Sequence, residues 1–100
     1  MNPFYYKKGE NSMIGSFVTS KAGHDKGRLY VVLAEMKDSV LLADGRLKTV
    51  ASPKKKKKRH VQPINTKVDK SLLDKLNASG QVTDEEIKYA VKSYLKQIPN

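Results

Sequence analysis

The 100-residue chain contains no cysteine and no tryptophan. The absence of cysteine excludes disulfides, thiolate-bound zinc ribbons and thiol catalysis, and it fits a reducing compartment. No apolar run approaches the ~18 residues that a membrane-spanning helix needs, and the first dozen residues lack the apolar stretch of a signal peptide. We therefore expect a soluble, cytoplasmic protein without a membrane partner. The length suits one small domain, or a smaller domain with an appendage.

What the chain does contain is positive charge. Lys and Arg number 20 against 10 Asp and Glu, which gives a net charge of +10. Residues 1–68 hold 15 of the basic and 5 of the acidic side chains, whereas residues 69–100 hold 5 of each. The excess positive charge therefore lies in the first two thirds of the chain. This asymmetry indicates a module that faces a polyanion, followed by a neutral C-terminal companion.

Residues 14–64 show the short apolar runs and turn signals of an all-β unit. We expect strands at 14–20, 29–35, 40–43, 47–50 and 60–62. Asp44-Gly45 predicts a tight type I′ hairpin turn, because that turn needs positive φ twice. Residues 51–59 are expected to form a charged loop, and Pro63 to end the fifth strand. Five short strands favour a small barrel, since closure leaves few unprotected edges.

Residues 69–98 switch to helical periodicity. We expect a short helix at 71–77 that ends with Gly80 at the C′ position. A second helix starts at Thr83, which forms a reciprocal capping box with Glu86. One apolar stripe then recurs at helical spacing, formed by Ile87, Ala90, Val91, Tyr94, Leu95 and Ile98. These features predict a helical hairpin whose stripe packs on the first helix and on the β unit. The alternative is that the stripe docks onto another protein.

The pattern divides the chain into three parts. Residues 1–12 are expected to form a flexible leader, 13–66 a five-stranded barrel, and 67–100 the helical hairpin. An alternative reading of the leader is a stacking arm for unpaired bases, built from Phe4, Tyr5, Tyr6, Lys7 and Lys8. Within the barrel, Phe17 and Val18 point to opposite faces of their strand, so one of them must face out or cover an end. An outward Phe17 or Tyr30 ring could stack on a base, although packing in the core or at an edge is the simpler expectation.

The segment after the first strand is the most informative one. Gly23 and Gly27 bracket a polar, charged loop, which indicates positive φ or a close approach to a partner's backbone. Asp25 is expected to organise this loop by accepting backbone amides, because a carboxylate repels phosphate.

A family resemblance rests on Gly15, Val18, Gly23, Asp25 and Gly27, together with Asp44-Gly45-Arg46, the lysine-rich segment and His60-Val61-Gln62-Pro63. These residues resemble the KOW domain, an SH3-like barrel found in ribosomal proteins and transcription elongation factors. The chain looks like the small bacterial KOW-type RNA-binding proteins, which are similar to a large-subunit ribosomal protein of archaea and eukaryotes. The resemblance covers about residues 13–65 and implies an SH3-like fold.

The resemblance also implies that the glycine-bracketed loop faces RNA. By position, phosphate contacts would come from Lys21, His24, Lys26 and Arg28, while Gly23 and Gly27 would let the backbone come close. A loop on a rigid β scaffold can present several cations at once. The alternative is that the glycines only make the turn and the charges are solvated.

A second basic segment is an unbroken run of six cations, Lys54, Lys55, Lys56, Lys57, Lys58 and Arg59. Such a run is expected to stay extended and solvated unless it meets a polyanion, and binding to RNA would release counterions. Competing interpretations are a nuclear import signal, attraction to acidic lipid and a role in solubility alone. Arg46 and Lys48 could extend the basic face, although scattered surface cations are common.

These observations predict an RNA-binding protein, most plausibly one that binds ribosomal RNA or associates with the ribosome. The alternatives are a protein-interaction module of the transcription or translation machinery, which would use the C-terminal helices, and a binder of duplex DNA. We expect no catalysis, because no nucleophile, base and orienting group occur together. Neither a cofactor nor a metal is expected, since His24 and His60 lack suitably spaced partners.

Overall fold

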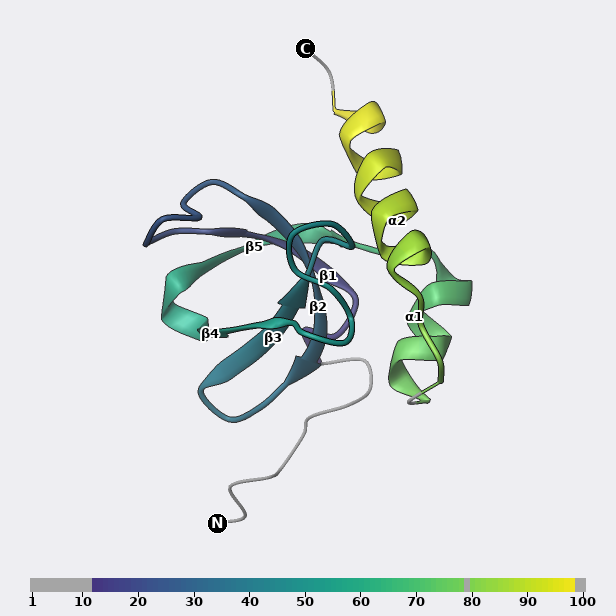
Figure 1. Ribbon diagram of the computed structural model, residues 1–100, viewed down its shortest axis with the longest axis horizontal. Coiled ribbons are helices and arrows are strands. Elements are labelled where there is room, and N and C mark those ends of the chain that lie inside the picture. The colour runs from purple at the N-terminus through teal and green to yellow at the C-terminus, as the bar shows by residue number, and fades with distance from the viewer. Residues whose placement is uncertain (1–11, 79, 99–100) are drawn as a thin grey trace.

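The computed structural model describes residues 12–78 and 80–98. Its elements are β1 (Ser16–Ser20), β2 (Leu29–Glu35), β3 (Ser39–Ala43), β4 (Lys54–Lys57), the 3₁₀ turn η1 (Lys58–His60), β5 (Val61–Lys67), α1 (Lys70–Asn77) and α2 (Asp84–Gln97). The strands form one antiparallel sheet in the order β4-β3-β2-β1-β5. The two helices follow the sheet and lie together on one side of it (Figure 1). A mainly β fold with two C-terminal helices is thus confirmed.

The sheet is buried on both faces at its centre. One core holds Val18, Tyr30, Val32, Val40, Leu42 and Val61. The other lies between the sheet and the helices and includes Phe17, Val31, Ala43, Val68, Leu72 and Ile87. Neighbours such as Phe17 and Val18 enter different cores because side chains alternate along a strand. Phe17 stacks on Tyr94 of α2, with ring centroids 4.7 Å apart, so the ring packs in the core and is closed to bases.

The predicted strand at 47–50 is wrong, and so is the loop predicted at 51–59. Residues 54–57 form β4, which pairs with β3 so that Leu42 lies opposite Lys54. The segment before β4 makes no ladder because its amides donate to carboxylates. Asp44 Oδ1 accepts from the amides of Arg46 (2.9 Å) and Lys48 (3.0 Å), and Asp84 Oδ1 accepts from the amide of Val50 (2.8 Å). The tight turn predicted at Asp44-Gly45 is therefore replaced by a long loop, 44–53.

The last strand is longer than predicted. β5 continues through Pro63 to Lys67, so the prediction that Pro63 ends the strand is wrong. Proline has no backbone N–H to donate, and it is tolerated here because β5 is an edge strand that pairs only with β1.

The helix caps follow the sequence closely. Thr83 and Glu86 form the predicted capping box, in which Thr83 Oγ1 accepts from the Glu86 amide (3.2 Å) and Glu86 Oε1 accepts from the Thr83 amide (3.0 Å). The Glu86 carboxylate also accepts a hydrogen bond from Lys75 of α1 at 2.7 Å. Gly80 is not at C′: the C-cap is Ala78, and the Gly80 amide reaches back to the Lys75 carbonyl at 2.8 Å.

The apolar stripe of α2 packs on the sheet along most of its length. Ile87 is fully buried, and Ala90, Val91 and Tyr94 are partly buried against the same core. Towards the C-terminus the stripe emerges, leaving Leu95 and Ile98 exposed. In the described part of the chain, neither helix combines the length and apolarity required to cross a membrane. The aromatics and lysines of the predicted leader lie outside the described residues, whereas Ser12, its last residue, is buried.

Candidate nucleic-acid interface

The glycine loop, residues 21–28, joins β1 to β2. Gly23 and Gly27 both have φ +86°, which confirms that these positions need the left-handed region. At the base of the loop the Gly27 amide donates to the Ser20 carbonyl at 2.8 Å and the Ser20 amide donates to the Arg28 carbonyl at 3.0 Å. A Cβ added at Gly27 would meet nothing within 4 Å. Conformation alone therefore requires glycine at that position.

Asp25 organises the glycine loop from within. Its Oδ1 lies 2.6 Å from the Lys56 ammonium and 2.9 Å from the Ser20 hydroxyl, and its Oδ2 accepts from the Tyr30 hydroxyl at 2.8 Å. Asp25 thus has the organising role that we expected, but the donors differ from the prediction. They are side chains from β1, β2 and β4, whereas backbone amides were expected.

Within the cluster that Asp25 forms with Lys56, Ser20 and Tyr30, the pKa values of Asp25 and Tyr30 are shifted. Burial by itself would raise the pKa of Asp25, but hydrogen bonds from Lys56, Tyr30 and Ser20, together with the Lys56 charge, hold that pKa well below its usual range. Burial and the neighbouring Asp25 carboxylate raise the pKa of Tyr30 to about 12. At neutral pH Asp25 is therefore a carboxylate and Tyr30 a neutral phenol.

The cationic run 54–59 is an edge strand followed by η1, and its side chains alternate between two environments. Lys56 has only 9% of its side chain exposed, and Lys58 donates to the buried Glu35 carboxylate at 2.6 Å. Lys54 is half-buried, whereas Lys55, Lys57 and Arg59 are exposed. We call these last three the outward cations. The expectation of a uniformly solvated run is therefore wrong, because strand alternation turns every second side chain inward.

The position of the run also suggests a purely structural benefit. β4 is short and lies at the edge of the sheet. Charged side chains, lysine above all, discourage another strand from adding to such an edge. Part of the lysine content is thus explained without any nucleic acid.

The glycine loop and the cationic run meet in space. Lys56 joins them through Asp25, and the Lys21 amide donates to the His60 carbonyl of η1 at 2.8 Å. The loop and η1 project together on the side of the sheet away from the helices (Figure 1). Within the loop, Lys21, His24 and Lys26 are exposed and Arg28 is half-buried. The structure therefore joins the loop that carries these four residues to the run that carries the outward cations.

Arg46 and Lys48 belong to a different part of the surface. They lie on the loop 44–53, which docks against the first turns of α2 through Gly45 and Val50. Arg46 is exposed and Lys48 is half-buried. Neither is joined to the glycine loop by a hydrogen bond or ion pair among the described residues.

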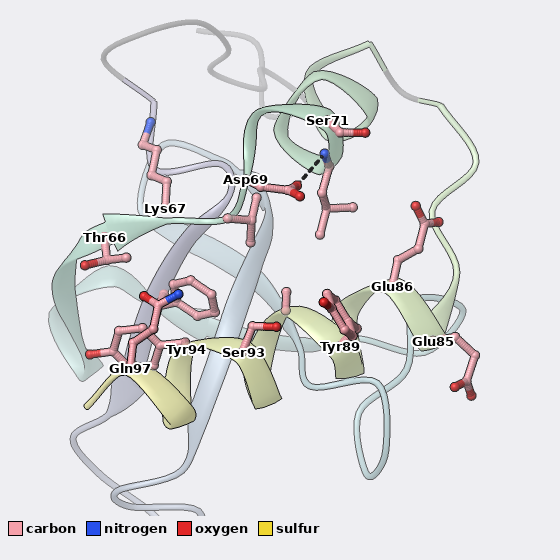
Figure 2. A pocket seen from close by; sticks show the side chains of 14 residues that line it. Thr66, Lys67, Asp69, Ser71, Glu85, Glu86, Tyr89, Ser93, Tyr94 and Gln97 are labelled. Carbon is pink, nitrogen blue, oxygen red and sulfur yellow. Dashed lines mark hydrogen bonds between the residues drawn. The ribbon is translucent and has the colours of Figure 1, made fainter. Parts of the chain in front are cut away.

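A groove that the sequence did not indicate runs between α2 and the β5–α1 segment (Figure 2). Its volume is about 560 Å³, and its apolar lining includes Phe17, Leu72, Ala90 and Tyr94. Tyr89, which is 73% exposed, stands at its edge. The only sequence signal for this groove is the apolar stripe of α2, which by itself does not show where the stripe leaves a gap.

No protein-family model matches the chain, and no curated protein matches it. In the described ranges 12–78 and 80–98, no group of three or more His, Asp or Glu side chains is placed to hold a metal ion.

Proposed function

We propose that this protein binds structured RNA, and ribosomal RNA in particular, as a cytoplasmic ribonucleoprotein component. The observation that carries the proposal is the joining of the glycine loop to the cationic run. Two basic segments that are distant in the sequence are held together by two contacts. One is the ion pair between Asp25 and Lys56, which are 31 positions apart, and the other is the Lys21–His60 hydrogen bond. Exposed cations from both segments therefore act on one polyanion, without a change in fold.

We further infer that the sheet closes as an SH3-like barrel of the KOW type. Its two edge strands are consecutive in the chain and are separated only by η1. Hydrogen bonds from Lys58 N to the Asp38 carbonyl (2.9 Å) and from Lys21 N to the His60 carbonyl hold η1 against the β2–β3 turn and the glycine loop. A core enclosed by β1, β2, β3 and β5 is what such a closed sheet needs.

In this mechanism the protein binds and does no chemistry. Lys21, His24, Lys26 and the outward cations contact phosphate, and the bound polyanion releases its counterions. Such contacts supply affinity and orientation but read no bases. The shape of the RNA is the main determinant of recognition, because the deep major groove of A-form RNA is closed to side chains.

The test compares two triple variants of equal charge. Lys55→Gln, Lys57→Gln and Arg59→Gln together remove the outward cations, and we expect the slope of log K against log salt to become shallower by about 2, at roughly 0.7 per phosphate contact. The measurement is fluorescence anisotropy of a structured ribosomal RNA fragment at several salt concentrations.

The matched control removes three exposed cations from the helices, through Lys70→Gln, Lys92→Gln and Lys96→Gln. We expect its slope to stay within about 0.5 of the wild-type value. Equal changes in both triple variants would contradict a localised interface. A DNA duplex of equal length, titrated at the same salt, distinguishes RNA from DNA, and tighter binding of the DNA would favour the DNA-binding alternative.

A second candidate function rests on the groove and on the exposed Tyr89 at its edge. Solvent-exposed aromatic side chains beside an apolar hollow are typical anchors for a protein partner. The helices would then dock the protein onto a component of the transcription or translation machinery. A protein that remains bound after nuclease treatment, and that Tyr89→Ser releases, would favour this function. Loss of all partners after nuclease treatment would favour RNA binding.

A further inference from the structure

We propose that Asp25 and Lys56 form an internal clasp that sets the glycine loop for phosphate, so that Lys56 is a positioning residue and makes no phosphate contact. This inference rests on the proposed RNA binding. It assigns the central lysine of the cationic run a role opposite to that of its neighbours Lys55 and Lys57.

The environment of Lys56 disfavours a contact with phosphate. Its ammonium donates to Asp25 Oδ1 at 2.6 Å and to the Ala22 carbonyl at 3.0 Å, which occupies two of its three donors. The Lys56 side chain is 9% exposed and that of Asp25 is 13% exposed. A phosphate contact would have to use the one remaining donor of a side chain that is almost wholly buried, beside an Asp25 carboxylate that Tyr30 also holds in place.

The clasp holds the part of the glycine loop whose backbone amides make no hydrogen bonds of their own to the described residues. The backbone amides of residues 22–25 donate to no acceptor in the described part of the chain, whereas the next three amides, 26–28, all make backbone hydrogen bonds. The clasp ties both Ala22 and Asp25 of this segment to β4. It therefore holds four unpaired donors and the exposed His24 in place, as a phosphate-binding loop requires.

The clasp also explains an acid inside a basic interface. An unpaired carboxylate at Asp25 would repel phosphate, but Lys56 neutralises it within the fold. The chain offers a comparison, because Lys58 makes a similar inward pair with Glu35. Glu35 also accepts from the Met13 amide at 2.7 Å. Within residues 12–78 and 80–98, neither Lys58 nor Glu35 is hydrogen-bonded to the glycine loop.

The experiment measures RNA affinity and its salt slope for Asp25→Asn, Lys56→Met, their double variant, Lys55→Met and Lys58→Met. We expect Asp25→Asn to weaken binding about tenfold, even though it removes a negative charge that simple electrostatics would count against RNA. Lys56→Met should weaken binding by a similar factor with an unchanged salt slope, whereas Lys55→Met should make the slope shallower by about 0.7. The double variant should be no weaker than either single one, because both remove the same contact.

Lys58→Met is the control for a general loss of stability. It should leave the affinity within about twofold and should not move the amide resonances of residues 22–25, which both clasp variants should move. Should Lys56→Met fail to fold, Asp25→Asn carries the test, because asparagine can keep the hydrogen bonds from Ser20 and Tyr30.

Three results would overturn the clasp. They are tighter binding by Asp25→Asn, a salt slope for Lys56→Met that falls as it does for Lys55→Met, and an equal loss of affinity in Lys58→Met. If none of the five variants changes RNA binding, the proposed function itself fails and the clasp loses its role with it. The response of Lys55→Met therefore distinguishes the two failures.

Discussion

Replacing Gly45 with alanine should lower the free energy of unfolding by about 3 kcal/mol or more. Gly45 has φ +80°, which costs an alanine roughly 1–2 kcal/mol. The added Cβ would also lie 2.5 Å from the Asp84 carbonyl oxygen and 2.9 Å from the Lys88 amide nitrogen. Both are backbone atoms of α2 and cannot rotate away, so the loop 44–53 must leave the helix. Urea denaturation monitored by circular dichroism measures the loss.

Gly27→Ala is the matched control for this prediction. It has the same kind of backbone conformation, with φ +86°, but its Cβ would meet nothing within 4 Å. Its cost should therefore be the strain alone, about 1–2 kcal/mol. A loss for Gly45→Ala that is no larger than this would contradict the close contact between the loop 44–53 and α2.

The sequence predicted best those features that depend on near neighbours. The capping box is an example, because Thr83 and Glu86 are three residues apart and their pairing needs no other part of the chain. The strands β1, β2 and β3 were also found, to within two residues at each end. Their runs of valine, leucine and tyrosine combine β propensity with an apolar face, so local preference and burial agree.

β4 was missed because its pairing opposes its composition. Lysine is a poor strand former, and five lysines in a row are expected to repel one another. Pairing with β3 overrides this tendency, and Asp25 and Glu35 supply inward-facing counter-charges for Lys56 and Lys58. Conversely, residues 47–50 have strand-like composition but lose their ladder to Asp44 and Asp84. Neither effect can be read within a short window of sequence.

The candidate site was predictable as a set of cations but not as a geometry. Composition alone located the charge in the glycine loop and the run 54–59. Which lysines point outward depends on the register of β4 against β3, and one residue of slip would exchange Lys55 for Lys56. The clasp depends on a contact between residues 31 positions apart. The one available hint was an aspartate among the cations of the loop, which calls for a counter-ion.

The pH dependence of stability offers a second large effect. The folded protein holds the pKa of Asp25 below its unfolded value of about 3.8. A carboxyl group of this kind stabilises the fold above its unfolded pKa, and the stabilisation is lost as pH falls from about 5 towards the folded pKa. We therefore expect Asp25→Asn to lower the free energy of unfolding by about 3 kcal/mol at pH 7, because Lys56 is left inside without its counter-ion. This difference should shrink on acidification.

Below about pH 4 the difference between the free energies of unfolding of the wild type and of Asp25→Asn should shrink. The limit is about 1.4 kcal/mol per pH unit, which corresponds to the uptake of one proton. Glu86 also has a lowered pKa, chiefly through its hydrogen bond from Lys75, but it is present in both proteins and cancels in the difference. Urea titrations from pH 7 to pH 2 make the comparison. A difference that stays constant over this range would show that Asp25 contributes through shape alone, without its charge.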